Sequence, residues 1–214
     1  MQKLIIIIAM ALVSYQAQAQ QSAADKHLAG GGDFDLGMRT SVSFFNDAGF
    51  VGQGVGGQFR LRFLERLNTE WYADILTTNI GNVGTRKDMH VGWSLMFYMF
   101  NTERVKGKFT PYIIAGHCFD GSHLFENRNH ANSGKINSSA VQMGLGTSYN
   151  ITDNFDLTLT AQYMNHLGGH MHSELYKDES GFDRLLIEKS SKTDFDGHLL
   201  VNLSLNVKLF DFWK

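Results

Sequence analysis

Hydrophobic and polar residues alternate with a period of two along most of the chain after residue 33. In the first such segment, every second residue from Phe34 to Phe44 is apolar or threonine, whereas Asp35 and Arg39 lie between them. Successive side chains of a β-strand point to opposite faces, so this spacing predicts a strand with one apolar and one polar face. The pattern predicts eight strands, at residues 34–44, 51–63, 69–79, 89–100, 109–119, 141–149, 155–163 and 199–209.

Each predicted strand is close to the roughly 9–11 residues that a tilted strand needs to cross a bilayer. Lipid offers no hydrogen bonds to a backbone, so strands cross it only as a closed barrel. The sequence therefore predicts an all-β fold, an eight-stranded antiparallel up-and-down transmembrane β-barrel. A water-soluble barrel or sandwich shares the alternation, but its outer face would carry the charges. Here the polar face is rich in small and amide residues, which favours the membrane barrel.

The N-terminus has the layout of a secretory signal. A basic start at Lys3 precedes an apolar run at residues 4–13, which is too short to span a bilayer, and Ala17 and Ala19 occupy the positions that a signal peptidase reads. A retained anchor is the alternative, but the run lacks a second charged boundary. We predict a signal peptide at 1–19, a short N-terminal periplasmic segment at 20–32 and an outer-membrane barrel at 33–214.

The connections between strands alternate in length. Short turns are predicted at 65–68, 101–108 and 150–154, and longer polar loops at 80–88, 120–137 and 168–196. Short periplasmic turns and longer external loops predict that both chain ends lie in the periplasm. Aromatic residues should mark the two membrane interfaces. The periplasmic set is Phe34, Phe63, Trp71, Phe97, Phe109, Tyr149, Phe155, Phe212 and Trp213, and the outer set is Phe44, Phe50, Phe119 and Tyr163.

The polar face defines the expected lumen, the space that the barrel encloses. Its charged members are Asp35, Glu70, Asp74 and Asp156 with Arg39, Arg60, Arg62 and Lys208, and its amides are Gln58, Gln142, Gln162, Asn202 and Asn206. An eight-stranded barrel has interior room only for side chains, so we expect a paired, hydrogen-bonded plug. Transport is the alternative. Gly52, Gly54 and Gly56 would leave space for a ligand, or would accommodate bulky neighbours or strand curvature.

Other residue types narrow the chemistry. The 19 Lys and Arg and 21 Asp and Glu residues are dispersed, which gives no reason to expect a nucleic acid partner. The single cysteine, Cys118, excludes an internal disulfide and should face inward or sideways. Two groups of histidines, at 117, 123 and 130 and at 166, 170 and 172, are expected in solvated loops or at the lipid head groups. They complete no recognised metal-ligand spacing, so we predict no metal and no cofactor.

Three segments resemble known outer-membrane proteins. KFTPYIIAG at 108–116 and GLGTSYNITDNF at 144–155 are similar to adjoining strands of the small OmpA/OmpX-like barrels, a group that includes porin-family barrels of Bacteroidota. The last strand, ending FDFW before Lys214, resembles the aromatic signal that barrel-assembly machinery reads, although there the aromatic residue ends the chain. We expect no peptidoglycan-binding domain after the barrel. The resemblance implies an architecture and names no activity.

A weaker resemblance concerns catalysis. Residues 161–169 are similar to the strand of PagL-type lipid A deacylases that carries a His-x-Ser-Asn motif. His166 matches the base, but Gly168 and Gly169 replace the Ser nucleophile and the Asn. Ser173 has the wrong spacing from His172. Without an oxygen nucleophile beside the base, ester hydrolysis has no first step, so we predict no enzymatic activity and no catalytic residues.

Two functions remain for a non-enzymatic barrel in the outer membrane of a Gram-negative bacterium. The first is a structural or accessory part of an outer-membrane protein assembly, of the secretion or barrel-assembly type. The second is a surface barrel that binds ligands or cells through its long loops, or passes small solutes. Expected partners are outer-membrane lipid, lipopolysaccharide and other proteins of that membrane.

Overall fold

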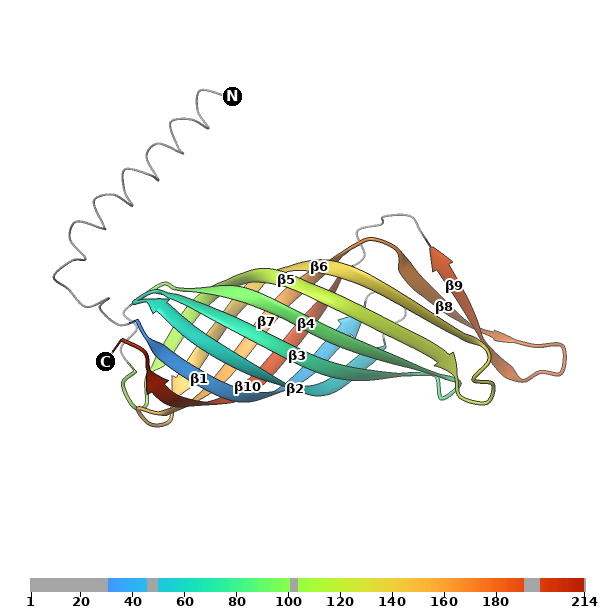
Figure 1. Cartoon of the computed structure of the whole chain (residues 1–214). Helices are drawn as coiled ribbons and strands as arrows, with labels where there is room; N and C mark the ends of the chain where they lie inside the picture. The colour runs from blue at the N-terminus through green and yellow to red at the C-terminus, as the bar shows by residue number, and fades with distance from the viewer. Residues whose placement is uncertain (1–30, 46–49, 101–103, 191–196, 214) are drawn as a thin grey trace, which may run out of the picture.

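The computed structural model describes residues 31–45, 50–100, 104–190 and 197–213, which form a closed antiparallel barrel with one additional hairpin (Figure 1). The barrel strands are β1 (Asp33–Phe45), β2 (Val51–Leu64), β3 (Leu67–Ile80), β4 (Gly84–Tyr98), β5 (Phe109–Glu126), β6 (Ser133–Asn150), β7 (Phe155–Leu167) and β10 (Gly197–Asp211). Each pairs with the next in the chain, and β10 pairs with β1 to close the barrel. The hairpin of β8 (His170–Lys177) and β9 (Asp183–Ser190) separates β7 from β10. The predicted fold class is confirmed. In the described part of the chain, no helix is long and apolar enough to cross a membrane.

The alternation of residue types becomes an alternation of burial. Along β7 the residues from Phe155 to Tyr163 that are odd in number are exposed, while those between them are buried in the lumen. Exposed apolar side chains run around the whole wall, with Met38 at 78% and Met143 at 67% exposure on different sides. A continuous exposed apolar band of this kind requires lipid around it.

Both described ends of the chain lie at one end of the barrel, where Asp33 of β1 pairs with Asp211 of β10 (Figure 1). We call this the terminal end, and the opposite one, which carries β8 and β9, the hairpin end. The expected signal peptide and most of the 20–32 segment lie outside the described residues. Gly32 is described, and its N–H donates to the Arg62 carbonyl, 2.7 Å away.

The strands at the hairpin end are longer than the sequence predicts. The expected loop at 80–88 is reduced to a turn at 81–83, and that at 120–137 to residues 127–132. Ladder pairs continue through these segments, as between His123 and Lys135. Most outward residues there are polar, Lys87 and Lys135 among them, so the hydrophobic alternation ends although the strands do not.

The expected loop at 168–196 also contains structure, because β8 and β9 form a hairpin over the mouth of the barrel. Met171 and Leu185 of the hairpin pack with Ile80 and Leu124 of the barrel in one buried cluster. Phe50 packs against this cluster, so its assignment to the lipid-facing outer girdle is wrong. The hairpin thus adds apolar side chains to a buried cluster at this end of the barrel.

Candidate functional site: the filled lumen

The middle of the lumen holds a network of buried ion pairs from four strands. Glu70 lies 3.3 Å from Arg39 and 2.7 Å from Arg60. Arg39 also lies 3.1 Å from Asp74, and Arg60 lies 3.5 Å from Asp156. The sequence analysis predicted these five residues to face inward and pair, and each is at most 4% exposed.

A second charged layer closes the terminal end. Arg62 lies 3.7 Å from Asp33, which also pairs with Lys208. Arg104, in the connection between β4 and β5, reaches back into the barrel to pair with Asp35. Burial lowers the pKa of the Arg104 guanidinium, but Asp35 and the other nearby carboxylates outweigh this, so the net shift is upward. Sequence reasoning placed Arg104 in a turn and missed its role, as it did that of Asp33.

Amide side chains fill the space between the charges. Gln58 donates to Asn206 over 2.6 Å, and Asn206 donates to Asp156 over 2.7 Å. Gln142 donates to Ser94 over 2.9 Å. The predicted inward amides are all buried, Gln162 and Asn202 included.

Beyond the central ion pairs the lumen turns apolar. Its buried cluster comprises Tyr72, Leu76, Cys118, Ala140, Met164 and Leu200. Cys118 faces inward, and its thiol donates to the Phe119 carbonyl at 3.3 Å. The sequence analysis named charged and amide residues of the lumen and did not predict this apolar layer. It forms because large apolar groups fill an enclosed space without needing partners.

The inward glycines of β2 are needed for close packing. A Cβ at Gly54 would lie 2.1 Å from the Ile75 carbonyl oxygen, and one at Gly56 would lie 2.0 Å from Asp74. The interpretation as accommodation of neighbours holds, because atoms of β3 already occupy the space beside both residues. Two interior cavities, one lined by Arg60 and Arg104 and one by Asp120 and His166, measure about 10 and 20 Å³. Each has room for about one water molecule.

Three buried histidines form a layer near the hairpin end. His166 Nε2 lies 3.2 Å from His198 Nδ1, and the rings of His198 and His90 stack with centroids 6.1 Å apart. The two carboxylate oxygens of Asp120 lie 3.4 Å from His90 Nε2 and 3.4 Å from His166 Nδ1. Asp120 therefore lies within ion-pair distance of both imidazoles.

This layer corrects the assignment of the histidines. His166 was expected at a loop or head-group level, but it is 7% exposed and faces the lumen. His130 and His172 are exposed, as predicted. His90 and His198 were overlooked, although each lies one residue from an outward apolar position. Among the described residues, no group of three or more His, Cys, Asp or Glu side chains is placed to hold a metal ion.

The surroundings of His166 also bear on hydrolysis. β7 ends at Leu167, so Gly168 is not in the strand register that a serine nucleophile would need. Its φ of +141° favours glycine. Ser138 Oγ lies 3.3 Å from His166 Nδ1, on the side of the ring that also faces Asp120. A nucleophile and an orienting acid on the same nitrogen do not make the relay in which they occupy opposite nitrogens.

Comparison with known proteins gives the same architecture. No model of a protein family and no curated protein sequence matches the chain. Among solved structures, it is similar to the outer membrane protein OprG of Pseudomonas aeruginosa, with TM-score 0.55 and 15% identity over 84% of this chain and 96% of that one. For the N-terminal β-barrel domain of OprF from the same organism, the TM-score is 0.53 and the identity 14%, over 84% of this chain and 99% of that one. For Ail, the attachment invasion locus protein of Yersinia pestis, the TM-score is 0.52 and the identity 12%, over 84% of this chain and 99% of that one.

These similarities show a shared fold, that of small outer-membrane barrels. The exposed apolar band gives an independent physical reason for the same location, because it cannot be left in water. The chain is an eight-stranded β-barrel of the outer membrane.

The central ion pairs predict a large effect of one neutral substitution. Glu70→Gln keeps the shape of the side chain but leaves Arg39 and Arg60 short of a counter-charge. We expect the free energy of unfolding to fall by about 3–5 kcal/mol, measured by urea titration in lipid vesicles. Asp153→Ala, in an exposed turn, is the control and should change it by less than about 0.5 kcal/mol. A loss below about 1 kcal/mol for Glu70→Gln would show that the network does not depend on this carboxylate.

Proposed function

We propose that the protein is a non-enzymatic, non-conducting barrel that serves as a structural or accessory component of an outer-membrane protein assembly. The observation that carries this proposal is the filled lumen. Charged layers occupy its terminal end and middle, histidines follow the apolar layer, and a buried apolar cluster lies at the hairpin end. A barrel without a passage acts through its outer surfaces, which meet outer-membrane lipid, lipopolysaccharide and neighbouring proteins.

A second candidate is a surface barrel that binds ligands or cells. Its specific support is the hairpin, where Leu175, Tyr176, Phe182 and Leu186 are each at least 40% exposed. Apolar residues that are exposed beyond the lipid-facing wall mark a contact surface. This candidate and the first differ in the part of the molecule that they require.

Conductance tests the closed lumen. The mature protein in a planar bilayer should show no steady conductance, because ion pairs and hydrogen bonds occupy the cross-section. A variant that combines Arg39→Ser, Arg60→Ser and Glu70→Ser removes the large side chains of the central layer and should conduct ions. Its folding is checked by the change in gel mobility that heating causes in a folded barrel. A long-lived open state of the unaltered protein would refute the closed lumen and favour solute transport.

Native co-purification separates the assembly role from the surface role. The tagged protein, extracted in mild detergent, should run on native gels as a stoichiometric complex with other outer-membrane proteins. Replacing Tyr176 and Phe182 with Ser should leave that complex intact. Isolation as a monomer, together with ligand or cell binding that this double variant abolishes, would favour the surface barrel and reject the assembly role.

The absence of catalysis has its own test. Membranes that contain the unaltered protein should release no more fatty acid from lipid A than membranes with His166→Ala, because around His166 the described residues do not place a nucleophile and an acid on opposite ring nitrogens. Release that depends on His166 would contradict the proposal. Ser138→Ala would then establish whether the hydroxyl beside His166 is the nucleophile.

A further inference from the structure

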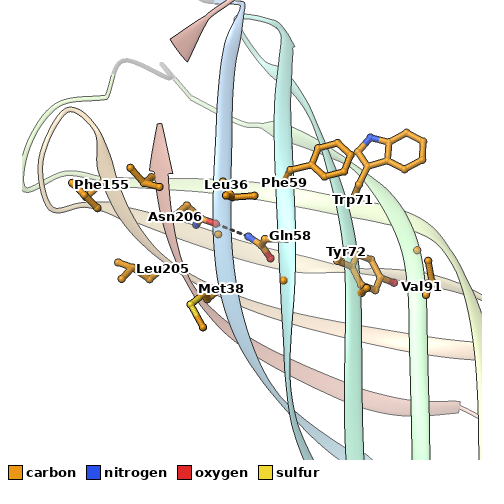
Figure 2. A pocket seen from close by; sticks show the side chains of 15 residues that line it. Leu36, Met38, Gln58, Phe59, Trp71, Tyr72, Val91, Phe155, Leu205 and Asn206 are labelled. Atoms are coloured by element: carbon orange, nitrogen blue, oxygen red, sulfur yellow. Dashed lines mark hydrogen bonds between the residues drawn. The ribbon is translucent and has the colours of Figure 1, made fainter. Parts of the chain in front are cut away.

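The outer wall contains an apolar groove of about 740 Å³ at the level of Gly57 and Ala73 (Figure 2). These two small residues are cross-strand partners on β2 and β3. Their neighbours in the same row are Met38 on β1 and Val91 on β4, which are larger and form the sides. The row is therefore interrupted by two small residues between two ridges.

Large flat side chains bound the groove toward the terminal end. In the next row, the rings of Phe59 and Trp71 lie nearly parallel, with centroids 6.1 Å apart and planes at 6°. Leu36 continues this row on β1. Figure 2 shows the side chains of Leu36, Phe59 and Trp71 on neighbouring strands.

The open space at Gly57 is not used by the chain itself. A Cβ built there would meet only the Gly37 carbonyl oxygen, at 3.8 Å, which is ordinary contact. On the inward side of the same strand, a Cβ at Gly54 or Gly56 would strike backbone or carboxylate atoms near 2 Å. Packing within the protein thus explains the inward glycines and leaves Gly57 unexplained.

The chemistry of the lining selects an apolar occupant. The outward side chains around the groove are aliphatic, aromatic or thioether groups. The amides of Gln58 and Asn206 approach the groove from behind, but they hydrogen-bond to each other on the lumen side (Figure 2). Among these outward side chains, the indole N–H of Trp71 is the one hydrogen-bonding group, and none carries a charge.

We propose that this groove holds an acyl chain of a phospholipid from the inner leaflet of the outer membrane. The groove is part of the band that lipid already contacts, and a flexible hydrocarbon chain can follow a notch between ridges. It extends from the middle of the wall toward the terminal end, where Phe155 and Val207 also line it. With the chain ends in the periplasm, as the connection lengths predict, that half of the wall faces the inner leaflet. The inference is independent of the proposed assembly role.

Photo-crosslinking in vesicles tests the groove. The mature protein is reconstituted in phosphatidylethanolamine with a trace of the same lipid carrying a diazirine in the middle of one chain, and labelled peptides are located by mass spectrometry. Adducts should concentrate on peptides from β1 to β4, Met38 and Val91 among them. Gly57→Leu should reduce them about threefold, because filling the notch removes many individually weak contacts with the acyl chain.

The matched control is Ala161→Leu, an outward substitution on β7. It adds apolar bulk to another part of the wall and should leave the adducts unchanged. Ala73→Val, a smaller change in the same notch, serves if Gly57→Leu does not fold. Four outcomes would each overturn the proposal. The adducts could be spread evenly around the wall, or Gly57→Leu and Ala73→Val could both leave them intact. Photoreactive lipid A could label the groove preferentially, or a second copy of the chain could protect it.

Discussion

The constraint on which this structure depends is that a backbone in lipid must satisfy all its hydrogen bonds within the protein. A closed antiparallel ladder does so, and β1 pairing with β10 completes it. Closure with eight strands makes the interior narrow, so residues on the inward face leave water when the barrel forms. The charged residues among them must then be paired, because an unpaired buried charge costs several kcal/mol. The Arg39, Arg60 and Glu70 network is thus a consequence of closure.

The narrow interior also determines where small residues lie. Tyr72 and Tyr112 face the lumen, and each lies over the glycine that it pairs with on a neighbouring strand. A Cβ at Gly92 would be 2.5 Å from the Tyr72 hydroxyl, and one at Gly146 would be 2.4 Å from the Tyr112 ring. A large inward side chain on one strand therefore requires a glycine at the paired position of the next strand. This pairing of large and small residues lets a small barrel reach the density of a protein core.

The sequence predicted the membrane-spanning part of the fold well, because lipid imposes an apolar outward face that makes each strand visible. Beyond the lipid this signal ends. Lys87 and Lys135 are outward residues of real strands, yet their polarity led to the prediction of loops. The β8–β9 hairpin was missed because its few buried residues, such as Met171, face a cluster formed by distant strands.

Some of the inward residues could be predicted from the sequence and others could not. Asp35 and Glu70 could be predicted from their parity within a clear strand, and the same parity would have placed His90 and His198 in the lumen. Those two were missed because histidine suits a head-group region as well as an interior. Arg104 could not be predicted, since it lies in a connection with no periodicity and reaches its carboxylates only through the fold.

Because side chains fill the lumen, the functions that we propose depend on the outer surface of the barrel. On a wall that only needs to be apolar, side-chain size is free to vary, so a notch at one position has no cost in lipid contact. Gly57 nevertheless lowers the intrinsic preference of β2 for an extended conformation, because glycine loses the most backbone entropy on ordering. Gly54 carries the same entropic cost, but its lack of a side chain allows the backbone of β3 to approach. At Gly57 an added Cβ would meet only the Gly37 carbonyl oxygen among the described residues, at 3.8 Å, so the space beside this glycine is open to lipid.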